Sequence, residues 1–160
     1  MELPSEFSRR IIDFAGDDGV AWLDALPARL KEAERMWGIA LQPPFPLSYN
    51  YVAPGTRGDG SEVVLKVGIP NHELRTEIEA LRLCDGRAAV RLLEADGDRG
   101  LLLLERIRPG TSLVELADDE QATAFAAGLM PDLWCPVPPR HSFPSVADWA
   151  LGLRRLRTRY

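Results

Sequence analysis

The sequence predicts an α+β fold, in which a five-stranded antiparallel sheet with one inserted helix lies between two helical regions. Two observations support this prediction. Short apolar, strand-like runs recur between residues 39 and 105, and helical apolar spacing occurs before, within and after that stretch. The resulting order is helices, three strands, a helix, two strands and helices. A parallel doubly wound sheet would require strict alternation of strands and helices.

The composition is typical of a soluble globular protein. The chain has 160 residues, of which 46% are hydrophobic and 27% charged, with a net charge of −5, so it has no general attraction for nucleic acid or anionic membranes. No stretch approaches the roughly 18 apolar residues that span a bilayer, and the N-terminus has no signal-peptide core. Cys84 and Cys135 are too few and too far apart for a disulfide framework or a zinc site. We therefore expect a cytoplasmic protein.

Two helices are expected in an N-terminal helical segment, residues 1–37. Apolar residues recur at helical spacing in residues 4–14, with Phe14 among them, and again in residues 20–37. Glycines between the two stretches end the first helix. Pro27 either kinks the second helix or marks the first turn of a separate one.

A sheet-containing lobe is expected over residues 38–110. The sequence predicts strands at 39–42, 47–53 and 62–67, a glycine-rich turn at 54–60, a helix at 71–84, and strands at 90–94 and 101–105. Asn71 suits the N-cap of the helix. The four leucines of 101–104 exceed what a half-exposed strand needs, so this strand is expected to be buried on both faces.

The remaining residues, 111–160, are expected to begin a second helical lobe. Helices are predicted at 118–129 and 145–160, joined by a proline-rich linker. The last helix carries an apolar stripe that needs a partner, formed by Val146, Trp149, Leu153, Leu156 and Tyr160. We expect this stripe to pack on the sheet lobe or to mediate self-association through residues 146–160. Because no capping glycine or proline follows it, the chain is expected to be part of a longer protein.

Lys66 is the most informative single residue, because it lies within the apolar strand 62–67. An ammonium group there needs either solvent or a partner, and from the strand pattern alone an ordinary solvent-facing lysine is the more frequent outcome. At about 100° per residue, the following helix places Glu77 at the edge of its buried face, Glu73 at the margin and Glu79 outside. A carboxylate at that edge needs a cation. We predict a Lys66–Glu77 ion pair, the arrangement that orients nucleotide phosphates in kinases.

Residues 64–113 and, before them, residues 37–62 resemble the aminoglycoside/hydroxyurea antibiotic phosphotransferases, a family that includes streptomycin kinases. The resemblance is good over about residues 35–115 and looser in the flanking helices. It implies a protein-kinase-like N-lobe, ATP and Mg²⁺ as cofactors, and phosphoryl transfer to a hydroxyl of a small-molecule drug acceptor. It also implies that Lys66 contacts phosphate with Glu77 as its partner. The hinge facing adenine would comprise Leu104, Glu105, Arg106 and Ile107; without the resemblance, this segment is simply a central strand leaving the core.

Two features depart from the family pattern. The loop expected to cover the phosphates, residues 42–48, has no glycine and contains three prolines, which lack the N–H groups that hold phosphate. The family's His-Gly-Asp motif is also absent, so no catalytic residue or metal ligand is assigned in this chain. We expect weak nucleotide binding and no activity of the chain alone. A non-catalytic nucleotide-sensing or protein-binding module is the alternative. Nucleic-acid binding through the arginines at 154–159 rests on local charge only.

Overall fold

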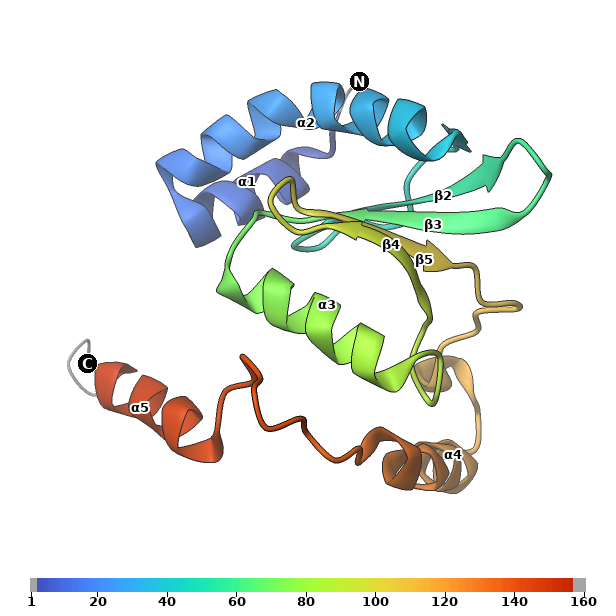
Figure 1. Cartoon of the computed structure of the whole chain (residues 1–160), viewed down its shortest axis with the longest axis vertical. Coiled ribbons are helices and arrows are strands. Elements are labelled where there is room, and N and C mark those ends of the chain that lie inside the picture. The colour runs from blue at the N-terminus through green and yellow to red at the C-terminus, as the bar shows by residue number, and fades with distance from the viewer. Residues whose placement is uncertain (1–2, 157–160) are drawn as a thin grey trace.

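The computed structural model describes residues 3–156, in which helices lie on both faces of one antiparallel sheet (Figure 1). The elements, in chain order, are α1 (Ser5–Ala15), α2 (Asp17–Trp37), β1 (Ile39–Leu41), β2 (Tyr51–Arg57), β3 (Glu62–Val67), α3 (His72–Cys84), β4 (Leu92–Asp96), β5 (Leu101–Glu105), a 3-10 turn (Leu113–Glu115), α4 (Asp119–Leu133) and α5 (Val146–Leu156). The predicted α+β class, with five antiparallel strands and a helix inserted after the third, is confirmed.

The five strands are ordered β1-β2-β3-β5-β4, and every neighbouring pair is antiparallel. The long helix α2 and the shorter α1 lie along one face, and α3 lies against the other (Figure 1). In the register of the three central strands, Val52 is opposite Lys66 and Lys66 is opposite Leu102. Because side chains alternate along a strand, these three residues share the face that α3 covers.

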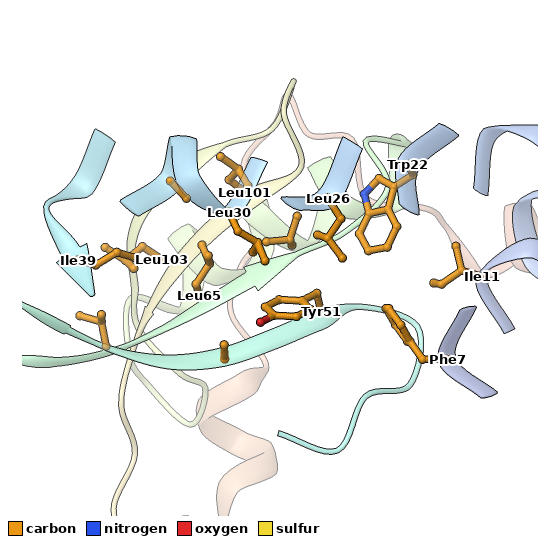
Figure 2. Close-up of a cluster of buried hydrophobic side chains, with 14 residues drawn as sticks. Phe7, Ile11, Trp22, Leu26, Leu30, Ile39, Tyr51, Leu65, Leu101 and Leu103 are labelled. Carbon is orange, nitrogen blue, oxygen red and sulfur yellow. The ribbon is translucent and has the colours of Figure 1, made fainter. Parts of the chain in front are cut away.

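The larger part of the core lies between the sheet and the two N-terminal helices (Figure 2). Its members are fully or almost fully buried and include Phe7, Ile11, Trp22, Leu26, Leu30, Tyr51, Leu65, Leu101 and Leu103. A smaller cluster on the opposite face joins Leu74 and Ile78 of α3 to Leu102 and Leu104 of β5. The prediction that residues 101–104 are buried on both faces is therefore confirmed, and α1 and α2 share one core with the sheet.

A close main-chain contact joins the ends of β3 and β5 to α2. Gly68 donates its N–H to the carbonyl of Gly100 at 2.9 Å, and the indole of Trp22 donates to the carbonyl of Gly68 at 2.9 Å. Gly100 has a φ of +75°, and a Cβ added there would collide with the Gly68 carbonyl. Both the backbone conformation and the space at residue 100 therefore require glycine.

Several predicted boundaries are wrong. α2 is one continuous helix that contains Pro27, so the alternative of two separate helices is excluded. β2 covers Tyr51–Arg57, not 47–53, and the turn is confined to its end. The reason is that Pro54 lies opposite the end of β1, where its carbonyl accepts a hydrogen bond from Gln42 at 2.9 Å and no ladder partner is needed for its missing N–H. β4 starts two residues later than predicted and contains a register irregularity between Leu92 and Glu94.

The C-terminal helices also differ from the prediction. α4 extends to Leu133, four residues further than expected. Val146 and Trp149 of α5 are 88% and 72% exposed, so this part of the apolar stripe does not pack on the sheet lobe. The side chains of the other stripe residues, Leu153, Leu156 and Tyr160, lie outside the described part of the structure. Within residues 3–156, no helix has the length and apolar character needed to cross a membrane.

Candidate functional site

The predicted ion pair between β3 and α3 is present. The Nζ of Lys66 lies 2.5 Å from Oε1 of Glu77, and the two side chains are 18% and 36% exposed. The side chain of Glu73, the other carboxylate near the buried face of the helix, is exposed, as expected for a residue at its margin. The role of this pair in holding phosphate stays a prediction, which the surroundings of the pair help to define.

The strand fixes Lys66 on the side of the sheet that faces α3. Val63, Leu65 and Val67 point into the core beneath α1 and α2, so Lys66 must project from the opposite face. Its neighbours in register are apolar, Val52 on β2 and Leu102 on β5. The methylene stem can lie along these side chains while the ammonium extends away from the sheet toward α3, where the carboxylate of Glu77 meets it.

The start of α3 is fixed by its cap, which places Glu77 in the second turn. Asn71 has an extended backbone, and its side chain accepts a hydrogen bond from the N–H of Leu74 at 2.8 Å. Leu74 and Ile78 then anchor the helix on β5. The helix ends where Asp85 adopts a left-handed conformation with φ 47°. Local sequence signals thus determine where the carboxylate of Glu77 lies.

A pocket of about 420 Å³ opens beside the ion pair. This volume is within the range of about 300–1,000 Å³ that small-molecule sites occupy. The lining residues come from α1, from the segment before β2, from β3 and the segment after it, and from α3: Phe14, Tyr49, Asn50, Lys66, Ile69, Asn71, Glu73, Leu74 and Glu77. The pocket therefore has one cationic group, two carboxylates and a largely apolar remainder.

Sequence reasoning did not identify the aromatic wall of this pocket. Phe14 was expected on the buried face of the first helix, but it is 59% exposed and packs edge-to-face on Tyr49, with ring centroids 5.8 Å apart. Asn50, next to Tyr49, also lines the pocket. The contact joins α1 to a loop 35 residues later, so no local signal indicates it. The one local signal at Phe14 is its helical spacing, which predicts a buried side chain and not a contact with Tyr49.

The proposed hinge is only partly free to meet a ligand. Leu104 is buried and Ile107 is 54% exposed. The N–H of Glu105 donates to the carbonyl of Arg91 at 3.0 Å, and its side chain accepts from the N–H of Arg91 at 2.7 Å. The N–H of Glu105 is therefore already engaged. Adenine recognition by this segment stays a prediction.

The proline-rich loop 42–48 joins β1 to β2, as predicted, and its Gln42 and Phe45 amides bond to β2. Phe45 donates its N–H to the carbonyl of Val52 at 3.0 Å. The guanidinium of Arg106 lies over the ring of Phe45, 4.5 Å from its centroid, which links the loop to the hinge by a cation–π contact. Because the Phe45 N–H is already bonded to β2 and the prolines have no N–H group, this part of the loop has few groups that could bind a phosphate.

No metal centre is apparent among the described residues. The structure there contains no group of three or more His, Cys, Asp or Glu side chains that could hold a metal ion. The residues present therefore suit a phosphate group better than Mg²⁺. The ammonium of Lys66, positioned by Glu77, lies on the wall of the pocket, whereas a Mg²⁺ site needs several oxygen ligands.

Comparison with known proteins gives the family. The profile described as "Aminoglycoside/hydroxyurea antibiotic resistance kinase" matches residues 48–159. A hydroxyurea phosphotransferase from Kitasatospora aureofaciens is 38% identical over 133 residues, which cover 81% of this chain and 39% of the relative. Streptomycin 6-kinases from Streptomyces glaucescens and Streptomyces griseus are both 32% identical, over 131 and 126 residues, which cover 81% and 78% of this chain and 43% and 41% of the relatives.

The chain thus spans about two fifths of the length of these curated relatives. The stretches that suggested the resemblance, residues 37–62 and 64–113, mostly lie within the matched region. The profile match covers more than half of the chain, and the names of the three relatives, a hydroxyurea phosphotransferase and two streptomycin 6-kinases, agree with the description of the profile. This chain belongs to the aminoglycoside/hydroxyurea antibiotic resistance kinase family.

Proposed function

We propose that this chain forms the nucleotide-binding part of an ATP-dependent phosphotransferase that acts on a hydroxyl of an aminoglycoside such as streptomycin, or on hydroxyurea. The observation that supports this proposal most directly is the Lys66–Glu77 ion pair on the wall of a pocket, in a chain of the antibiotic kinase family. A strand lysine paired with a carboxylate on the next helix is the arrangement by which kinases orient phosphates.

Each member of the pair has a defined task in this proposal. ATP supplies the phosphoryl group to be transferred. Lys66 contacts the phosphate oxygens of ATP as a point charge. Its side chain is 18% exposed, so the ammonium can be reached from the pocket. Glu77 holds the ammonium in one position, so less side-chain freedom is lost when the phosphate binds. We assign Mg²⁺ ligands to no described residue of this chain.

The 160 residues alone are proposed to bind nucleotide weakly and not to turn over. They contain no His-Gly-Asp sequence, which in the family carries the catalytic base, and in the loop 42–48 the Phe45 amide is bonded to β2. Phosphoryl transfer depends almost entirely on positioning and charge stabilisation. A chain that offers one lysine therefore has too few groups for the reaction.

Titration of the purified chain with ATP, ADP and AMP, followed by NMR chemical shifts, tests the nucleotide site. Lys66→Ala should weaken ATP binding about ten-fold or more, because a charge-assisted hydrogen bond contributes about 1.5–3 kcal/mol. Lys31 is the only other lysine of the chain and is exposed on α2, so Lys31→Ala is the matched control and should bind ATP as the wild type does. Equal ATP affinity of the Lys66 and Lys31 variants would refute the site.

The second candidate is a non-catalytic module that senses nucleotide or binds a protein, which the glycine-free loop 42–48 favours. An assay for drug-dependent ADP release tests what the two candidates share, because neither predicts turnover by the chain alone. We expect no ADP release above background when streptomycin or hydroxyurea is added with ATP. Drug-dependent ADP release that Lys66→Ala abolishes would show that the chain carries the catalytic parts after all.

A further inference from the structure

The segment that joins α4 to α5 follows the outer side of α3, the helix that carries Glu77 (Figure 1). Two sets of contacts hold it there. Near the C-terminal end of α3, Arg87 reaches Cys135. In the middle of the helix, the carboxylate of Glu79 accepts hydrogen bonds from both the N–H and the hydroxyl of Ser142, at 3.2 and 2.7 Å. We call residues 134–145 the strap, because they run against α3 in the opposite direction.

The two cysteines of the chain meet at the first of these contacts. Arg87 follows the end of α3, and its main-chain N–H and its Nε both donate to the carbonyl of Cys84, at 2.9 and 3.2 Å. The Nη2 of the same guanidinium lies 3.6 Å from the sulfur of Cys135. Burial, followed by the neighbouring Cys135 thiol, raises the pKa of Cys84. A single arginine thus joins the main-chain carbonyl of one cysteine to the sulfur of the other, which brings the two cysteines together at the end of α3.

We propose that Cys84 and Cys135 form a redox-active thiol pair, in which a peroxide or a low-molecular-weight disulfide converts the two thiols into an intramolecular disulfide between α3 and the strap. Both cysteines are free and half-buried, so an oxidant can reach them without unfolding. The prediction that two cysteines so far apart in the sequence give no disulfide framework considered the sequence only. The chain path along α3 brings them together.

The oxidation balances with hydrogen peroxide as the oxidant. The sulfur of Cys135 attacks one peroxide oxygen, the O–O bond breaks, and a sulfenic acid and one water form. The sulfur of Cys84 then attacks the sulfenic sulfur, the S–S bond forms, and the hydroxyl leaves with the Cys84 proton as a second water. We assign the first attack to Cys135 because its sulfur lies 3.6 Å from the Arg87 guanidinium, whereas Arg87 contacts only the main-chain carbonyl of Cys84.

The disulfide would close a loop of about fifty residues and so restrict the unfolded chain. It would also fix the strap at a point about two helical turns beyond Glu77. The proposal does not depend on nucleotide binding, because it concerns only the two thiols and the segments that carry them.

The full chain is reduced, freed of reductant and treated with stoichiometric hydrogen peroxide, and in parallel with oxidised glutathione. Mass spectrometry of the intact protein and of its peptides identifies the product. We expect loss of two hydrogens from the monomer and a peptide that links Cys84 to Cys135. The oxidised protein should unfold at a temperature higher by roughly 5–15 °C, and reductant should reverse the shift. Cys84→Ser and Cys135→Ser should each show no shift.

Two results would overturn the proposal. One is that oxidation gives only sulfinic acid, a glutathione adduct or an intermolecular dimer, with no linked peptide in the monomer. The other is that the linked peptide forms equally fast in the folded chain and in the chain unfolded by urea, which would show that the fold does not bring the thiols together. Arg87→Lys, which keeps a charge at the site but removes the fork that reaches both cysteines, should slow the linking reaction several-fold.

Discussion

The Lys66–Glu77 pair makes a quantitative prediction about stability that is independent of nucleotide. Lys66→Met replaces the ammonium by an apolar group of similar length, among Val52 and Leu102. It leaves Glu77, which is 36% exposed and can be hydrated. Removing one member of a fully buried pair is costly because the remaining charge is left unpaired, but the remaining Glu77 carboxylate is exposed enough for water to replace the ammonium, so we expect a loss of no more than about 0.5 kcal/mol.

Glu77→Gln should cost more, because it leaves the less exposed member of the pair. Lys66 is only 18% exposed, so its ammonium loses a charged partner where water replaces it poorly. A fully exposed ion pair is worth about 0–1 kcal/mol and a hydrogen bond to a charged group about 1.5–3 kcal/mol. The pair lies between these limits, which gives an expected loss of about 1–1.5 kcal/mol for Glu77→Gln.

Urea unfolding of the wild type, both single variants and the double variant measures the coupling free energy between the two residues. The double variant removes both charges, so its loss should be smaller than the sum of the single losses by about 1 kcal/mol. A coupling free energy below about 0.3 kcal/mol, within the additivity found for unrelated sites, would refute the reasoning. So would a larger loss for Lys66→Met than for Glu77→Gln.

Three further predictions concern other parts of the molecule. Gly100→Ala should lower the free energy of unfolding by at least about 2 kcal/mol, measured in urea, whereas Gly38→Ala, with a φ of +59° in open space, should cost about 1 kcal/mol. Hydrogen bonds from Ser142 of the strap lower the pKa of Glu79. The stabilisation by Glu79 is therefore present above its unfolded pKa and is lost as the pH falls through its folded pKa. In Glu79→Gln, the free energy of unfolding should depend less steeply on pH in the acid range. If residues 146–160 mediate self-association, sedimentation should show it lost in Trp149→Ser and kept in Trp134→Ser, a matched exposed tryptophan.

The parts of the fold that could be predicted from the sequence are those that local periodicity determines. The spacing of Leu74 and Ile78 defines the buried side of α3, and the same spacing places Glu77 at its edge. Strand alternation alone places Lys66 on one side of β3. Because both signals are local and α3 follows β3 directly, the pair could be predicted without knowledge of the topology. The structure confirms it at 2.5 Å.

Boundaries within the sheet depend on neighbouring strands, which the sequence does not show. β2 includes Pro54 and Gly55, two residues that favour turns when considered alone. They are accommodated because β1 is short: Gln42, just past its end, donates to the Pro54 carbonyl, and an added Cβ at Gly55 would lie 3.2 Å from the carbonyl of Ala40. The close approach of β1 favours a small residue at position 55, so these residues reflect tertiary packing and not a turn.

The contacts that sequence reasoning missed all join segments far apart in the chain. Phe14 meets Tyr49 at the wall of the pocket, and Arg87 links the carbonyl of Cys84 to the sulfur of Cys135 in the strap. Neither contact follows from helical or strand periodicity, because each depends on the path of a connecting segment over the surface of the lobe. The two contacts also lie at opposite ends of α3, the pocket at its start and the thiol pair at its end. A ligand at one end and an oxidant at the other would therefore act on the same helix, the one that holds Glu77 against Lys66.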